Sequence, residues 1–270
     1  MEITRAQIAA VVEAVAKKAK YRAIQTGLIE SLAAEALAKG KKPKEAIKEV
    51  SAKLHQVGAA YFSGPADYAS WQSELADLPT DLNHPAVKEF CQMHMRTHSS
   101  TQERLPILEE FFHTTLACIA PVTSILDLAC GLNPLALPWM PLAEKCSYYG
   151  CDIFNDMTGF LNQFLAHFEI TGRIESSDIT QLKFPRQAQV AFLLKTLPCL
   201  EQLEKGISPV LLDAVPADAL LISYPIRSLG GRAKGMGKTY ETQFKKLMAG
   251  RNWRVERFEF KNELAFLVKK

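Results

Sequence analysis

Several sequence signals that would fix a class of protein are missing from this chain of 270 residues. None of its apolar runs approaches the roughly 20 residues that a membrane-spanning helix needs. The first ten residues, MEITRAQIAA, also lack the basic and then apolar pattern of a secretory signal. We therefore expect a cytoplasmic protein that has no contact with a membrane.

The six cysteines follow no pattern that is typical of a metal site or of a disulfide framework. The sequence contains no CxxC pair, and several of the cysteines lie inside apolar runs. Reduced thiols are therefore expected, and no metal ligands are assigned.

Two motifs of nucleotide and methyl-transfer enzymes are absent as well. The chain has no GxGxxG fingerprint, which argues against a dinucleotide-dependent oxidoreductase, because a pyrophosphate needs close backbone and a helix N-terminus. It also has no Asn/Asp-Pro-Pro-aromatic segment, and this absence disfavours methylation of an exocyclic amino group.

The basic charge of the chain is concentrated at its N-terminal end. Residues 1–60 hold eleven Lys and Arg against six Asp and Glu, whereas the rest of the chain holds 21 against 23. The spacing of apolar residues predicts three helices in this segment. Thr4 caps the first, Thr26 caps the second, and Pro43 suits the first turn of the third. A small bundle with basic outer faces is suited to binding an anion.

From about residue 85 onward, predicted strands alternate with predicted helices. The strands are expected at Ser124–Leu128, Tyr148–Asp152, Arg173–Ser177, Val190–Lys195, Ala219–Ser223, Trp253–Phe260 and Glu263–Val268. The alternation indicates an α/β fold with a parallel, doubly wound sheet, and the short link between the last two strands fits a hairpin. This order is typical of a Rossmann-like class I methyltransferase fold, with a seven-stranded, mostly parallel sheet and a C-terminal antiparallel hairpin.

The same patterns divide the chain into two predicted domains. Residues 63–84 contain turn formers and little periodicity, so we place a linker or hinge there. Residues 1–84 are predicted to form a basic helical domain with its linker, and residues 85–270 the methyltransferase domain.

Acidic residues stand at or just past the ends of three successive predicted strands, where ligands of such sheets bind. Asp152 ends the second strand, where a carboxylate can accept hydrogen bonds from ribose hydroxyls. Asp178 and Ile179 follow the third strand and can bind and cover an adenine ring. Together with Asp127, these residues predict a nucleoside-type ligand without a phosphate, such as S-adenosylmethionine. For any one of these acids, a helix cap is the alternative.

The fourth predicted strand runs into Lys195 and then into Pro198 and Cys199. Lys195 ends an apolar strand, and its burial is costly unless it meets an anion or a polar ligand. Pro198-Cys199 is similar to the Pro-Cys nucleophile of cytosine-C5 methyltransferases, although a cysteine at the start of an apolar helix also serves as a structural residue. Upstream, Ser100 and Glu103 are spaced as a capping box for a helix start.

The loop after the fifth predicted strand is rich in glycine and in cations. The segment SYPIRSLGGRAKGMGKTY, residues 223–240, has four glycines and no acid. Glycine lets the backbone approach a ligand closely, and clustered cations suit a phosphate-rich partner. A solvated basic loop is the alternative interpretation.

Taken together, these segments resemble the aminoglycoside-resistance 16S rRNA methyltransferases of the Arm/Rmt family, which methylate guanine 1405 at N7. The likeness covers nearly the whole chain, and its most specific parts are ACGLNP at 129–134 and RSLGGR at 227–232. Other matching segments are KYRA at 20–23, GAAY at 58–61, GCDI at 150–153, and the stretches 98–105 and 195–201. The chain departs from the family pattern at Cys199, at Pro106 and in a longer linker.

The resemblance implies S-adenosylmethionine as the cofactor and the 30S subunit, through its 16S rRNA decoding region, as the partner; no obligate protein partner is expected. The implied cofactor-binding residues are Tyr61, His98, Ser99, Ser100, Arg104, Ala129, Gly131, Asp152, Asp178, Ile179 and Leu194. Arg104 is expected to pair with the methionine carboxylate.

The resemblance also implies that the basic N-terminal helices and the 227–238 loop bind RNA. The expected RNA-binding residues are Lys17, Lys18, Lys20, Arg22, Lys53, Arg227, Lys234 and Lys238. Lys195 and Arg232 are expected to hold the target nucleotide, which makes them the predicted catalytic residues. Resistance to 4,6-disubstituted deoxystreptamine aminoglycosides follows from the same resemblance.

Two other functions stay open. The first is a methyltransferase for another RNA base, such as adenine N1 in the decoding site, or for a small molecule. The second is a non-catalytic RNA-binding protein with a vestigial fold, which would bind no cofactor.

Overall fold

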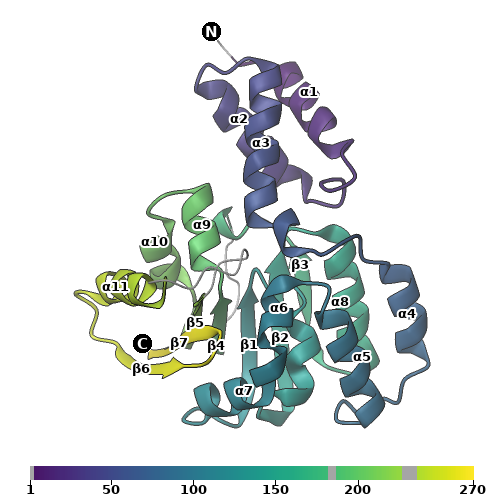
Figure 1. Ribbon diagram of the computed structural model, residues 1–270, viewed down its shortest axis with the longest axis vertical. Coiled ribbons are helices and arrows are strands. Elements are labelled where there is room, and N and C mark those ends of the chain that lie inside the picture. The colour runs from purple at the N-terminus through teal and green to yellow at the C-terminus, as the bar shows by residue number, and fades with distance from the viewer. Residues whose placement is uncertain (1–2, 182–186, 227–235) are drawn as a thin grey trace.

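The computed structural model describes residues 3–181, 187–226 and 236–270. Its centre is a seven-stranded sheet with the order β3-β2-β1-β4-β5-β7-β6 (Figure 1). The strands are β1 (Val122–Leu128), β2 (Leu142–Asp152), β3 (Thr171–Ser176), β4 (Ala188–Leu194), β5 (Ala217–Pro225), β6 (Arg254–Glu259) and β7 (Glu263–Lys269). The first five run parallel, and β7 pairs antiparallel with both β5 and β6. The Rossmann-like fold with its C-terminal hairpin is therefore confirmed.

Helices cover both faces of this sheet because the strand residues alternate between two apolar clusters. Phe192 of β4 packs in the cluster that includes Phe111 and Phe160, whereas its neighbour Leu193 packs in the cluster that includes Phe244. The first face is covered by α5 (Pro85–Met95), α7 (Leu108–Leu116) and α8 (Asn155–His167), and the second by α9 (Leu197–Leu203), α10 (Ile207–Ala214) and α11 (Met236–Met248). The result is a three-layer sandwich with the helices on the outside.

Short helical segments connect the larger elements. They are η1 (Ala59–Tyr61), α6 (Ser99–Arg104), η2 (Leu105–Ile107), η3 (Asn133–Trp139) and η4 (Ile179–Gln181). The predicted capping box of Ser100 and Glu103 is wrong. Helix α6 begins at Ser99 with His98 as its N-cap, and the structure shows no side-chain hydrogen bond at this cap. Glu103 instead forms an ion pair with Lys195.

The basic N-terminal segment forms three helices that pack on one another: α1 (Arg5–Ala16), α2 (Thr26–Ala38) and α3 (Pro43–Val57). Figure 1 shows them as a projecting group, with α3 leading back to the sheet. The predicted cap at Thr4 is confirmed, and Gln7 completes it as a capping box. The cap of α2 lies one residue earlier than expected, because the Gln25 side chain accepts a hydrogen bond of 2.7 Å from Leu28 N.

Residues 63–84 do not form the extended linker that their composition suggests. They contain α4 (Tyr68–Ala76), capped by Asp67, and this helix packs against α8. Trp71 and Leu75, one helical turn apart, are buried. Two apolar positions in a nine-residue helix give too little periodicity to be recognised in the sequence. The division of the chain between residues 84 and 85 stays a prediction.

A buried ion pair joins α6 to the C-terminal hairpin. Arg104 donates to both carboxylate oxygens of Glu263, at 2.6 and 3.1 Å, and to Asn133 Oδ1 at 3.2 Å. Arg104 and Glu263 are 1% and 0% exposed. Burial alone would raise the pKa of Glu263, but the charges of Arg104 and Lys195 hold that pKa below its usual range.

None of the helices in the described parts of the chain is long and apolar enough to cross a membrane. The six cysteines are all free thiols.

We predict that Glu263→Gln lowers the free energy of unfolding at pH 7 by about 3–5 kcal/mol, because it leaves the buried Arg104 without its counter-charge. Urea denaturation measures this loss. The exposed Glu259→Gln serves as the control, because its ion pair with Arg257 lies at the surface, where such pairs contribute about 0–1 kcal/mol.

The pH dependence gives a second check on the same variant. Because the folded-state pKa of Glu263 is lowered, its stabilisation is complete above the unfolded pKa of about 4.3 and is lost as the pH falls through the folded value. The difference between wild type and Glu263→Gln should therefore shrink in that acidic window. A difference that is constant down to pH 3 would contradict this assignment.

Candidate active site

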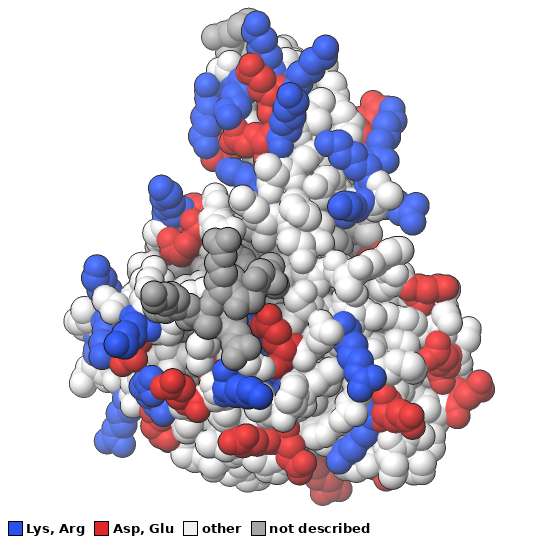
Figure 2. Space-filling model, viewed as in Figure 1, with Lys and Arg blue, Asp and Glu red and all other residues white. Residues whose placement is uncertain are grey.

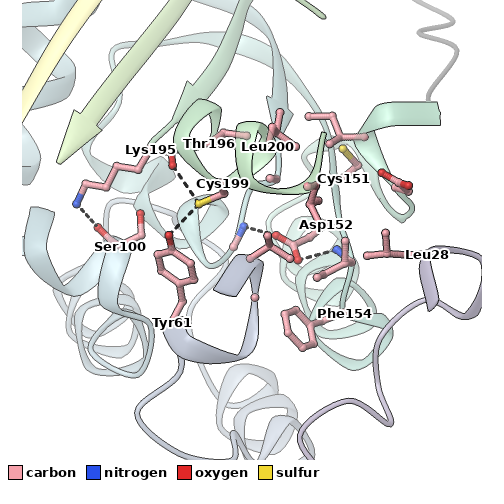
Figure 3. Close-up of a pocket in the computed structure, with 18 of the residues that line it drawn as sticks. Leu28, Tyr61, Ser100, Cys151, Asp152, Phe154, Lys195, Thr196, Cys199 and Leu200 are labelled. Atoms are coloured by element: carbon pink, nitrogen blue, oxygen red, sulfur yellow. Dashed lines mark hydrogen bonds between the residues drawn. The ribbon is translucent and has the colours of Figure 1, made fainter. Parts of the chain in front are cut away.

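A hollow of about 750 Å³, which includes its open mouth, lies at the carboxyl ends of β1, β2 and β4, and Figure 3 shows side chains that line it. It is lined by Leu28, Val57, Gly58, Tyr61, His98, Ser100, Ala129, Gly131, Cys151, Asp152, Ile153, Phe154, Ser177, Asp178, Ile179, Leu194, Lys195, Thr196, Cys199, Leu200 and Leu203. This is the edge of the sheet at which a doubly wound fold binds its ligand. We call this hollow the pocket.

Nine of the eleven residues that were predicted to bind the cofactor line the pocket. They are Tyr61, His98, Ser100, Ala129, Gly131, Asp152, Asp178, Ile179 and Leu194. The other two lie outside its lining. Ser99 donates its hydroxyl to the carbonyl of Tyr61 at 2.9 Å, and Arg104 is buried against Glu263. The expected pairing of Arg104 with a methionine carboxylate stays a prediction.

Asp152 is oriented in the pocket by hydrogen bonds from the backbone. Its Oδ2 accepts a hydrogen bond of 2.8 Å from Gly131 N, and its Oδ1 accepts one of 2.7 Å from Ile153 N. Burial raises the pKa of Asp152, and the backbone donors oppose that rise. Each carboxylate oxygen has a second lone pair, so the group can still accept hydrogen bonds from a ligand's hydroxyls.

Asp178 and Ile179 stand on the neighbouring strand end. Asp178 Oδ1 accepts hydrogen bonds from Thr180 N at 2.9 Å and from Thr180 Oγ1 at 2.8 Å, which orients the carboxylate. Ile179 is buried in the pocket lining. Both residues line the pocket, and their contact with a nucleobase stays a prediction.

Asp127 does not line the pocket, which corrects the expectation that all three strand-end acids bind one ligand. It is buried and accepts hydrogen bonds from the Tyr148 hydroxyl and from Asn133 Nδ2, the latter at 2.7 Å. Burial raises the pKa of Asp127 to about 6. The side chain faces inward because it precedes the last residue of β1, and successive strand residues point to opposite sides.

The backbone at the ends of β1 and β4 is strained. Ala129 has φ of 56°, Gly131 of 52° and Lys195 of 60°, all in the left-handed region that residues other than glycine rarely adopt. A Cβ on Gly131 would lie 3.0 Å from His98 Cε1. Such strain is concentrated at binding and catalytic sites, and here it brings bare backbone to the pocket.

His98 is an uncharged element of the pocket wall. Its ring stacks on Tyr61, with centroids 5.7 Å apart. Burial, followed by the charges of Lys195 and Arg104, lowers the pKa of His98 to about 3. Within the described parts of the chain, neither His98 Nδ1 nor the buried Ser177 Oγ has a hydrogen-bond partner. Unpaired buried polar atoms in a pocket fit a polar ligand.

The buried ammonium group of Lys195 lies close to two carboxylates and a backbone carbonyl. Its Nζ lies 2.6 Å from Glu103 Oε2, 3.2 Å from Ser100 O and 3.6 Å from Glu263 Oε2. The predicted role of Lys195 in holding a target base stays a prediction. In the region that the structure describes, no group of His, Cys, Asp and Glu could hold a metal ion.

Cys199 is a structural thiol and not an activated nucleophile. Its Sγ lies 2.8 Å from the Tyr61 hydroxyl oxygen and 3.6 Å from Lys195 O (Figure 3). Burial raises the pKa of this thiol, whereas a nucleophilic cysteine needs a lowered pKa. The comparison with cytosine-C5 methyltransferases is therefore contradicted.

The cations predicted to bind RNA or to hold the target nucleotide differ in their surroundings. Arg227, Arg232 and Lys234 lie outside the described residues, while Lys238 is exposed in α11. Three others have partners within the N-terminal helices: Lys17 with Glu13, Lys18 with Ser51 and Lys53 with Glu35. Lys20 and Arg22 are exposed and take part in none of the ion pairs between described residues. Figure 2 shows Lys and Arg gathered over the projecting N-terminal helices.

Sequence reasoning missed part of the pocket wall. Leu28 of α2, together with Val57 and Gly58 at the end of α3, lines the pocket although these residues belong to the basic helical segment. A contact between residues so distant in the chain leaves no local pattern, and the only signal was the segment GAAY at 58–61.

A family model and several known proteins match nearly the whole chain. The model of a family described as "Ribosomal RNA methyltransferase (FmrO)" matches residues 17–267. A 16S rRNA (guanine(1405)-N(7))-methyltransferase of Micromonospora echinospora is 33% identical over 261 residues, which cover 96% of this chain and 95% of that relative. One of the same name from Frankia casuarinae is 35% identical over 264 residues, covering 96% and 92%.

Solved structures agree in fold. The 16S rRNA methyltransferase RmtF, crystallised with S-adenosyl-L-homocysteine, has a TM-score of 0.82 and 27% identity over the whole of both chains. The 16S rRNA methylase RmtB has a TM-score of 0.80 and 22% identity, covering 97% of this chain and 98% of its own, which supports the fold alone.

We predict that iodoacetamide at pH 8 modifies Cys118 well before Cys199. Cys118 is exposed, whereas burial raises the pKa of Cys199 and keeps it as the less reactive thiol. Peptide mass spectrometry over a time course measures both rates in one sample. Faster labelling of Cys199 would restore the nucleophile hypothesis.

Proposed function

Because the chain belongs to the FmrO family of ribosomal RNA methyltransferases, we propose that it transfers a methyl group from S-adenosylmethionine to N7 of guanine 1405 in the 16S rRNA of the 30S subunit. The observation that carries this proposal is the match over nearly the whole length with relatives that bear this activity in their names. The pocket supports it, since its acids and unpaired polar atoms stand at the edge of the sheet where doubly wound folds bind their ligands.

The pocket residues fit S-adenosylmethionine. Asp152 would accept hydrogen bonds from the ribose hydroxyls, while Asp178 and Ile179 would bind and cover the adenine. Gly131 has no side chain, so the backbone next to Ala129 would allow close approach of the cofactor. When bound, the cofactor supplies the electrophilic methyl group.

The chemistry of guanine N7 agrees with the protonation states of the pocket. N7 has an available lone pair and no proton, so methyl transfer requires neither a general base nor a covalent nucleophile. His98, with a pKa of about 3, is neutral, and burial raises the pKa of Cys199. The protein therefore contributes by holding the base in line with the methyl group, and orientation alone can supply a large part of a rate enhancement.

The basic surfaces give the expected route to RNA. We infer that the N-terminal helices, through Lys20 and Arg22, contact phosphates of the folded rRNA, because these exposed cations are not taken up by ion pairs within the described residues. A base inside an RNA helix must be unstacked to reach the pocket. Lys195 and Arg232 are proposed to hold that base, and Arg227, Lys234 and Lys238 to bind phosphates.

Methylation at this atom would explain antibiotic resistance. N7-methylguanine carries a positive charge, which repels the ammonium groups of 4,6-disubstituted deoxystreptamine aminoglycosides. We propose that the protein confers resistance to kanamycin- and gentamicin-type drugs in this way.

The direct test is to incubate the protein with isolated 30S subunits and labelled S-adenosylmethionine. Borohydride and aniline treatment cleaves RNA at N7-methylguanine, and reverse transcription maps the cleavage. We expect one stop, at guanine 1405. Label at another base would reject the proposed target, and no label at all would favour a non-catalytic RNA-binding protein.

A second prediction concerns the cofactor. Asp152→Ala should weaken binding of S-adenosylhomocysteine about 10- to 100-fold, since hydrogen bonds to a charged group contribute roughly 1.5–3 kcal/mol. Isothermal titration calorimetry measures the dissociation constant. Glu175→Ala, on the exposed side of the adjacent strand β3, is the matched control and should bind as wild type does. Equal affinities for both variants would remove Asp152 from the cofactor site.

A further inference from the structure

The basic N-terminal helices form part of the pocket as well as a surface for RNA. Leu28 of α2 is only 2% exposed and lines the pocket, and Val57 and Gly58 line it from the end of α3. Asp152 and Ile153 line the same hollow. One wall of the pocket is therefore supplied from outside the sheet and its covering helices.

Two backbone hydrogen bonds fasten this wall to the loop that follows Asp152. Gln25 N donates to Ile153 O at 2.8 Å, and Asn155 N donates to Ala23 O at 2.7 Å. Ile24 and Phe154 are thus paired as an isolated antiparallel bridge. We call these paired segments, residues 23–25 and 153–155, the bridge.

Close packing at Gly58 reinforces the bridge. A Cβ on Gly58 would lie 3.0 Å from Ile153 Cδ1 and 3.0 Å from Phe154 Cε2. This distance is shorter than ordinary van der Waals contact, so only the absence of a side chain lets the end of α3 pack so closely on the bridge. Gly58 has φ of −144° and ψ of −68°, outside the left-handed region that favours glycine, so the close contact at its Cβ position is what restricts a side chain there.

A continuous chain of hydrogen bonds runs from α2 to the pocket acid. The Gln25 N–H bonds the carbonyl of Ile153, and the N–H of the same Ile153 bonds Asp152 Oδ1. The Ile153 backbone therefore orients one oxygen of the Asp152 carboxylate, while Gly131 N orients the other.

We propose that Ala23–Gln25 and Gly58 are positioning residues of the cofactor pocket, and that they act by holding residues 153–155 so that Asp152 faces the ribose of S-adenosylmethionine. This proposal rests on the proposed function for the identity of the ligand.

A pair of substitutions at Gln25 isolates the hydrogen bond. Gln25→Pro removes the N–H donor, and the φ of −53° at this position suits proline. Ile24, the preceding residue, is already in the extended bridge, as a residue before proline prefers. Gln25→Ala keeps the N–H but, like the proline variant, loses the side-chain cap on Leu28 N. The comparison of the two variants therefore reports on the bridge alone.

We expect the dissociation constant of S-adenosylhomocysteine, measured by calorimetry, to rise about three- to tenfold in Gln25→Pro relative to Gln25→Ala. The KM for S-adenosylmethionine in 30S methylation should rise by a similar factor, while kcat at saturating cofactor stays close to that of Gln25→Ala. A merely structural role would change the melting temperature without this separation of KM from kcat.

A second pair of variants keeps the test independent of proline. Gly58→Ala should also weaken binding of S-adenosylhomocysteine, because its Cβ displaces Ile153 and Phe154. Gly64→Ala is the matched control, since nothing lies within 4 Å of a Cβ there, and it should bind as wild type does.

The outcomes separate the bridge from the proposed function. Equal affinities of the two Gln25 variants, whether both normal or both weak, would overturn the role of the bridge. So would wild-type affinity in Gly58→Ala. Calorimetry needs no RNA, so a clear difference between the Gln25 variants without methylation of guanine 1405 by wild type would overturn only the proposed target. Failure of wild type to bind S-adenosylhomocysteine would overturn both.

Discussion

Glu263, a carboxylate without access to water, pairs with Arg104 and lies 3.6 Å from Lys195 Nζ. Neither cation could be buried alone at acceptable cost, and a buried carboxylate without them would take up a proton. Their mutual neutralisation fixes three elements relative to one another: α6, the start of β7 and the end of β4. The pocket opens next to this junction, so its shape depends on the charges remaining paired. The same pairing holds Arg104 through two hydrogen bonds to Glu263 and one to Asn133.

The pocket that results is suited to positioning and not to proton transfer. His98 is neutral, burial raises the pKa of Cys199, and Lys195 is engaged with carboxylate and carbonyl oxygens. A reaction that removes a proton from its substrate would be poorly served by these groups. Methyl transfer to a ring nitrogen with a free lone pair needs none of them as a base. These groups are not suited to act as a general base, which agrees with the proposed chemistry.

Local features of the sequence predicted most of the fold and half of the site. The strands were recognisable because their apolar runs are short and bounded. Asp152 and Asp178 were recognisable as pocket residues because the ends of parallel strands meet at one edge of the sheet. Tertiary packing decides which side of its strand Asp127 faces. It also decides that Arg104 pairs with Glu263, which lies 159 positions further along the chain. The bridge between residues 23–25 and 153–155 depends on it too, because two backbone hydrogen bonds require no particular side chains.

The apolar wall that Leu28 and Val57 contribute has a consequence for inhibitors. A compound that occupied only the space beside Asp152 and Asp178 would touch groups that any nucleoside-binding sheet of this kind can offer. One that extended an apolar substituent toward α2 and the end of α3 would touch a surface that the sheet itself does not provide. Discrimination between this protein and other methyltransferases would then come from the helices that contribute Leu28 and Val57, while affinity would come from the strand ends that carry Asp152 and Asp178.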